Sequence, residues 1–243
     1  MGPGLTVLHL DGAAVFEGTF CTFPTEFTFR CENQPQLIDR IGDQLRGAAA
    51  LYAADERSEE LLILPDQLSA ALVFTYSGHG LQAASSSLRS LARALRAAGV
   101  SLTKSRDFFL ELLASEAGGF TQSPYDEIET VPLHSYVALT SNGMSTRPYP
   151  NVTPLVVPEV DYEEQLHLAA EEITANASAA ATMSGTLTSH LTAGADSRLV
   201  GATLTAAGVA DKFVFFCGAN AVTREQDIAQ KVAGHMGWTM TQH

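Results

Sequence analysis

Hydrophobic and polar positions follow strand-like spacing over the first part of the chain. Between residues 45 and 86, short apolar runs alternate with turn-forming clusters such as Asp55–Ser58 and Pro65–Asp66. This pattern is typical of an antiparallel sheet whose strands follow one another as a meander. The strands it predicts are Leu45–Tyr52, Glu60–Leu64, Ala71–Tyr76 and Gly80–Ala84.

The pattern then turns helical. Residues 85–98 are predicted as a helix because leucines recur there at helical spacing, and Ser85 or Ser86 is the expected N-cap. Two further elements are expected, a short helix at Arg106–Leu113 and an extended segment at Val131–Leu139. Together these elements predict an antiparallel α+β domain over residues 1–150.

A second pattern begins after a proline-rich stretch. Residues 147–158 carry four prolines and little periodicity, so we predict a linker there. Beyond it, helix and strand patterns alternate, which predicts parallel strands joined by crossover helices in an incomplete α/β domain over residues 159–243. The expected elements are Tyr162–Thr182, Thr186–Leu191, Ser197–Ala207, Lys212–Phe216 and Glu225–Met236.

Only two parallel strands are recognised in this second domain, at Thr186–Leu191 and Lys212–Phe216. A sheet of that size leaves an unpaired edge, and exposed edges invite pairing with other strands. We therefore expect the edge to be covered by the first domain, by a second chain or by a segment that follows His243.

Composition narrows the classes of function. Acidic residues outnumber basic ones 27 to 14, for a net charge of -13, so the chain lacks the basic face that nucleic-acid binding needs. No segment approaches the roughly 18 apolar residues of a membrane span, and no signal peptide is recognised at the start, so a soluble cytoplasmic protein is expected. The three cysteines have neither disulfide nor zinc-site spacing.

One loop combines features that favour phosphate binding. Small residues follow the predicted strand Thr186–Leu191 and lead into a helix, which lets backbone N–H groups and the positive helix end approach a phosphate. Ser197 adds a hydroxyl, and Asp196 is expected either to cap the helix or to hold Mg²⁺. An ordinary strand-to-helix turn is the alternative interpretation of the same residues.

The segment Leu191–Arg198 resembles the Ser-Gly-Gly-X-Asp-Ser pyrophosphate loop of the asparagine synthetase family. That family activates a carboxylate as an acyl-adenylate and transfers the acyl group to an amine. The surrounding chain is similar as well, both around the loop and in the glutamine amidotransferase domain that precedes it in the family. The segments that carry this similarity are Leu45–Tyr52, Leu62–Asp66, Leu72–Tyr76, Ala83–Ser86, Tyr125–Pro132, Glu163–Thr182, Asp211–Gly218 and Asp227–Gly237.

The resemblance implies a degenerate Ntn-hydrolase-like first domain and an incomplete Rossmann-like nucleotide-binding domain. It also implies ATP and Mg²⁺ as cofactors and an unidentified carboxylate as substrate, with Asp196 at the metal. The nucleotide-binding positions it suggests are Leu191, Thr192, Gly194, Asp196, Ser197 and Gly218. Arg198 is placed to reach a phosphate or the acyl substrate, with a solvent-facing role as the alternative.

The chain also departs from the family pattern. The family's glutaminase nucleophile is a cysteine directly after the initiator methionine, whereas this chain has Gly2, so glutamine hydrolysis is not expected. Ala193 and Thr192 replace the family's first glycine and serine, and alanine costs roughly 1 kcal/mol if the position needs positive φ. The family's residues for amide formation match nothing before His243, so no catalytic residue is assigned.

Two functions from different classes remain open. The first is part of an ATP-dependent amide-forming ligase that lacks glutaminase activity, as in β-lactam synthetases and lasso-peptide cyclases. The second is a pseudoenzyme, a non-catalytic scaffold that retains the fold, and a nucleotide sensor is a weaker third option. Family relatives often dimerise, so a homo-oligomer is compatible with the sequence, although no residue decides the matter.

Overall fold

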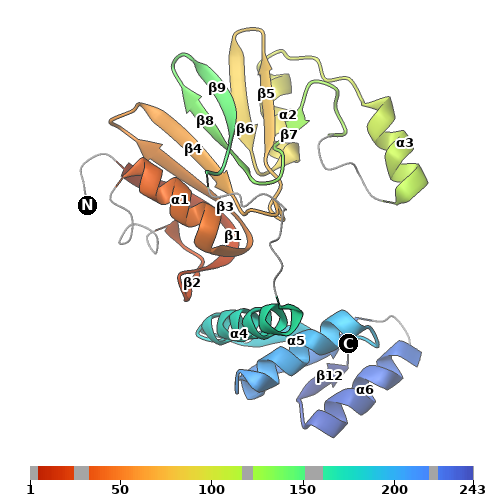
Figure 1. Ribbon diagram of the computed structural model, residues 1–243. Coiled ribbons are helices and arrows are strands. Elements are labelled where there is room, and N and C mark those ends of the chain that lie inside the picture. Colours follow the sequence, from red (N-terminus) through yellow and green to blue (C-terminus); the bar gives the residue numbers. More distant parts are fainter. Residues whose placement is uncertain (1–4, 25–32, 117–122, 151–160, 219–223, 243) are drawn as a thin grey trace. The chain divides into compact units, whose positions relative to one another are not determined.

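The computed structural model describes residues 5–24, 33–116, 123–150, 161–218 and 224–242 (Figure 1). The chain is an α+β protein that divides into two compact units. Unit 1 comprises Met1–Glu17 and Cys21–Pro154, and unit 2 comprises Gly18–Phe20 and Leu155–His243. No helix among the described residues is both long and apolar enough to cross a membrane.

The largest of the described sheets is six-stranded, in the order β2-β1-β3-β4-β8-β9, and all of its strands except β2 lie wholly in unit 1. Helix α1, Gln34–Gln44, lies against one face of it, and buried Leu37 and Ile41 pack on the strands there (Figure 1). Proline at the start and the Asn33 side chain, which accepts a hydrogen bond from the Gln36 amide, fix where α1 begins. The strands are β1 Leu5–Phe16, β2 Thr19–Cys21, β3 Leu45–Asp55, β4 Glu60–Pro65, β8 Ser135–Thr140 and β9 Gly143–Pro148.

A second, three-stranded sheet of unit 1 has the order β6-β5-β7. Helix α2, Leu88–Ala97, packs on it through Leu91 and Leu95, and α3 covers Arg106–Ser115. The predicted single meander is therefore wrong: β4 pairs with β8 instead of β5, so the strand run is divided between two sheets. The strands are β5 Phe74–Gly78, β6 Leu81–Ser85 and β7 Glu129–Thr130.

Two local expectations in unit 1 also need correction. The N-cap of α2 is Ser87, whose side chain accepts a hydrogen bond from the Ser90 amide, and neither Ser85 nor Ser86 fills that role. The predicted linker at 147–158 begins too early, because Arg147 belongs to β9 and Tyr149 is buried in the core. Residues 151–158 of that linker lie outside the described residues.

Unit 2 is a parallel three-stranded sheet with the order β10-β11-β12. Helices α5 and α6 connect its strands, and α4 precedes them (Figure 1). The expectation of only two strands is wrong, since Phe215 and Cys217 of β11 pair in parallel with Met240 and Gln242. The elements are α4 Tyr162–Ala180, β10 Leu187–His190, α5 Ala195–Ala206, η2 Ala210–Lys212, β11 Phe213–Cys217, α6 Arg224–Met236 and β12 Met240–Gln242.

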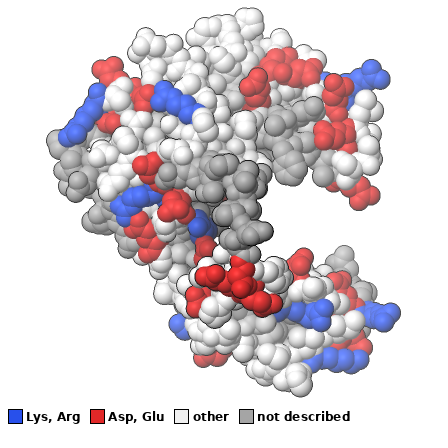
Figure 2. Space-filling model, in the orientation of Figure 1, with Lys and Arg blue, Asp and Glu red and all other residues white. Residues whose placement is uncertain are grey.

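The core of unit 2 lies between this sheet and its helices. Buried Phe215 and Cys217 of β11 pack with Leu204 of α5 and with alanines of α6. In the described part of the unit, β10 and β12 are the two edge strands. The acidic side chains of α4 gather on the outer surface over that helix (Figure 2), and they include Glu163, Glu164, Glu171 and Glu172.

Candidate functional site

The loop Leu191–Ser197 lies at the carboxyl end of β10, where α5 begins. Leu191 is fully buried, and its amide donates to the Phe216 carbonyl over 2.8 Å. The chain is therefore anchored directly before the loop. Because Leu191 points into the core and its amide is engaged, this residue positions the loop and leaves ligand contacts to those that follow.

The loop is closed by its own hydrogen bonds. The Thr192 amide donates to Oγ of Ser197 over 2.9 Å, and the two hydroxyl oxygens lie 3.0 Å apart. The Gly194 amide donates to Oγ1 of Thr192 over 3.0 Å. Thr192 thus supplies a hydroxyl that holds the turn, and Ser197 ties the helix back to it.

Helix α5 starts without a side-chain cap. Gly194 is the N-cap, with extended φ of −69° and ψ of 156°, and Asp196 lies inside the first turn, so the expectation that Asp196 caps the helix is wrong. The first amides of any helix lack intrahelical acceptors, and Ala195 and Asp196 are solvent-exposed here. This end of α5 therefore presents backbone donors and the positive end of the helix dipole.

Alanine at position 193 carries no backbone strain. Ala193 is not among the described residues with positive φ, so the expected cost of alanine at this position does not arise. Gly194 also has negative φ, which any residue adopts. The loop conformation therefore does not require glycine at either position.

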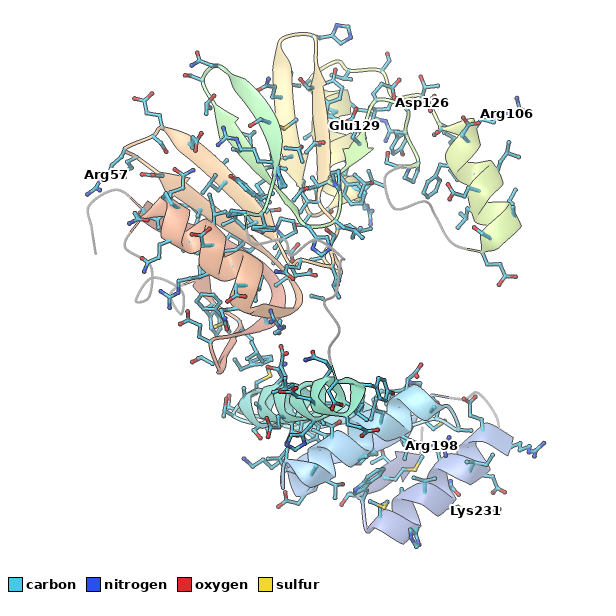
Figure 3. The ribbon with its side chains drawn as sticks, in the orientation of Figure 1. Arg57, Arg106, Asp126, Glu129, Arg198 and Lys231 are labelled. Carbon is cyan, nitrogen blue, oxygen red and sulfur yellow. The ribbon has the colours of Figure 1, made fainter. Side chains whose placement is uncertain are left out.

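One cation lies beside the loop. The Nε of Arg198 donates to the Gly194 carbonyl over 3.1 Å, which draws its guanidinium back towards the loop, and the side chain remains exposed (Figure 3). A guanidinium in this position adds positive charge next to the open helix end. Backbone donors and Arg198 favour an anion at this surface, while the exposed carboxylate of Asp196 in the same turn opposes it.

His190 is a neighbour of the loop that the sequence analysis missed. Its Nε2 accepts a hydrogen bond of 3.2 Å from the Gly218 amide, and its ring contacts that of Phe216, with centroids 5.1 Å apart. The amide of Gly218, a suggested nucleotide-binding position, is therefore engaged. The sequence offered one clue to this contact, the position of both residues at strand ends. His190 is the last residue of β10, and Gly218 directly follows β11.

Cys217 ends β11, directly before Gly218, yet the residue is only 2% exposed. Burial raises the pKa of the Cys217 thiol, and the nearby negative charge of Glu225 raises it further. A raised pKa lowers the thiolate fraction at neutral pH, and the thiolate is the reactive form. Cys217 is therefore a core residue and not a nucleophile.

We expect Cys217 to resist alkylation in the folded protein. At pH 8, iodoacetamide should modify it at least about a hundredfold more slowly than in the urea-unfolded chain, because attack needs both exposure and a thiolate. The rate should also go on rising with pH beyond the usual thiol range before it levels off, since the raised pKa delays full ionisation of the thiol. Peptide mass mapping measures both rates, and equal rates in the folded and unfolded chains would contradict the assignment.

Asp196 is the residue suggested for Mg²⁺. Among the described residues, no group of three or more His, Cys, Asp or Glu side chains is arranged to hold a metal ion. Mg²⁺ often binds through one or two carboxylates together with substrate phosphates, and a single exposed carboxylate fits that mode only together with a bound phosphate. The suggested metal site therefore depends on a bound nucleotide.

Comparison with known proteins does not assign the chain to a family. The chain matches no protein-family model and no curated protein. The case for a function therefore rests on the residues and geometry of the loop.

Proposed function

We propose that unit 2 binds the phosphates of Mg-ATP at the loop Thr192–Ser197, as part of a carboxylate-adenylating, amide-forming enzyme that resembles asparagine synthetases and lacks glutaminase activity. The observation that carries this proposal is the uncapped start of α5 directly after β10, with Arg198 folded back on the loop. A helix N-terminus with open amides at the carboxyl end of a parallel strand is a recurrent phosphate site.

Asp196 determines which form of the nucleotide the site favours. Its carboxylate is exposed in the first turn of α5, so it repels free phosphate oxygens that approach the same helix end. Asp196 would hold the Mg²⁺ that accompanies the nucleotide, and the positive charge of the metal would offset this repulsion. The site should therefore prefer Mg-ATP over metal-free ATP.

The proposal also includes a partner for the sheet. β10, which carries the loop, is an edge strand in the described part of unit 2. A further strand beside β10, from a second chain or from a segment beyond His243, would enclose the loop and supply the groups for acyl transfer to an amine. The carboxylate substrate and the catalytic residues belong to that larger assembly.

A non-catalytic scaffold is the second candidate, and one observation favours it. The Gly194 amide and the Ser197 hydroxyl bond within the loop, and the Gly218 amide bonds to His190. These groups are satisfied without a ligand, so the loop is stable as an ordinary strand-to-helix turn. The two candidates differ in whether the open helix amides bind phosphate.

Calorimetric titration of the full chain tests the proposal. Asp196→Asn should weaken Mg-ATP binding by about tenfold and strengthen binding of ATP in EDTA, because the carboxylate holds the metal but repels bare phosphate. Asp211→Asn, the same charge change beyond the far end of α5, should leave both affinities unchanged. If the wild type does not bind Mg-ATP, the scaffold is supported instead. If both variants change the affinity equally, Asp196 acts only through the net charge of the chain and does not hold the metal.

A further inference from the structure

Unit 2 has a cavity at the amino end of its sheet, at the opposite end from the loop Leu191–Ser197. This cavity has a volume of about 380 Å³ and lies before the first residues of β11 and β12. Its lining includes Thr205, Gly208, Asp211, Met236, Gly237 and Trp238. Small-molecule sites begin at about 300 Å³, so the cavity suits a small ligand.

Two helices end at this cavity. α5 closes on Gly208, with φ of 69°, and the Val209 amide donates to the Leu204 carbonyl over 3.0 Å. α6 closes in the same way on Gly237, with φ of 70°, and the Trp238 amide donates to the Ala233 carbonyl over 2.9 Å. Both are Schellman-type ends, so the negative ends of two helix dipoles converge on one cavity.

A carboxylate adds to this negative potential. Asp211 is exposed, and it is the single charged residue among the described residues that line the cavity. The adjacent Lys212 bonds elsewhere, since its Nζ donates to the Ala181 carbonyl over 3.4 Å. The cavity is therefore electrostatically suited to a cation.

An aromatic ring forms part of the wall. The indole of Trp238 stacks on Phe215, with centroids 4.6 Å apart and an interplanar angle of 15°, and its Nε1 donates to Oγ1 of Thr205 over 3.1 Å. These two contacts fix the ring of Trp238, a half-buried residue that lines the cavity. Indoles are the best aromatic partners for organic cations, and the thioether of Met236 adds an apolar contact surface.

We propose that this cavity binds a small alkylammonium cation. Asp211 and the two helix ends supply the negative potential, while Trp238 and Met236 contact the alkyl groups. A bare metal ion would gain little from the apolar wall, and an anion would meet a carboxylate and two negative helix ends. The site is separate from the phosphate loop and does not depend on the function proposed for it.

The single tryptophan of the chain makes the test direct, because Trp238 is itself in the wall. Choline serves as the probe, and 3,3-dimethylbutan-1-ol, its uncharged isostere, serves as the matched ligand without charge. Choline chloride should change the Trp238 fluorescence saturably at constant ionic strength. The alcohol should bind at least about fivefold more weakly, since it lacks the attraction of the cation to the indole and the carboxylate.

Two variants test whether choline binds at this cavity or is attracted only by the net negative charge of the chain. Asp211→Asn should weaken choline binding about fivefold, whereas Glu163→Gln, an equal charge change in the first turn of α4, should leave it unchanged. Calorimetry on the same variants gives an independent measure of affinity. The proposal is overturned if choline gives no saturable signal, if the alcohol binds equally well, or if both variants lose the same affinity.

Discussion

Gly12→Ala is expected to lower the free energy of unfolding of unit 1 by about 4 kcal/mol or more, the largest single effect we anticipate. Gly12 in β1 has φ of 97°, and a Cβ added there would lie 2.1 Å from the carbonyl oxygen of Ala48. That oxygen belongs to the backbone of β3, where Gly12 pairs with Ala49, so it cannot turn away as a side chain would. Alanine would therefore force β1 and β3 apart.

The matched control is Gly80→Ala, in the hairpin between β5 and β6. Gly80 has φ of 72° but nothing within 4 Å of an added Cβ, so only the left-handed backbone cost of about 1 kcal/mol applies. Urea denaturation followed by far-UV circular dichroism compares the two variants. The explanation fails if Gly12→Ala costs no more than Gly80→Ala, because the steric contact would then be relieved without loss.

The same glycine shows why β1 was not predicted from the sequence. The strand has a register irregularity between Val7 and His9 and a left-handed residue at Gly12, so its apolar positions do not alternate regularly. The strands β3 and β4 were predicted, because each contains a short apolar run next to a cluster of turn-forming residues. The pairing of β4 with β8 depends on residues far apart in sequence, and for that reason the meander was wrong.

The place of the candidate loop in the chain was predicted from the sequence, but its hydrogen bonds were not. Small residues between a strand and a helix located the loop, and the structure places it at that junction. Which group caps α5, and which amides are already bonded, depends on side-chain directions that spacing does not encode. The bond between His190 and Gly218 joins two strand ends that are brought together only by the parallel pairing of β10 and β11.

Gly201→Ala should have the second largest effect, lowering the free energy of unfolding of unit 2 by about 2–3 kcal/mol. A Cβ on Gly201, which is buried in α5, would lie 2.3 Å from Cη2 of Trp238. The indole cannot yield freely, because it is stacked on Phe215 and hydrogen-bonded to Thr205. The steric cost therefore exceeds the gain in helix propensity of about 1 kcal/mol that alanine brings to a helix interior.

Gly234→Ala in α6 measures the gain in helix propensity without the steric cost. Gly234 is exposed, and nothing lies within 4 Å of an added Cβ, so this variant should gain about 0.5–1 kcal/mol from helix propensity alone. Trp238 fluorescence during urea denaturation reports on unit 2 for both variants, since it is the only tryptophan in the chain. Opposite signs for the two variants are the expected result. Stabilisation by both would mean that the indole moves without cost, which would also weaken the case for Trp238 as a rigid wall of the cation site.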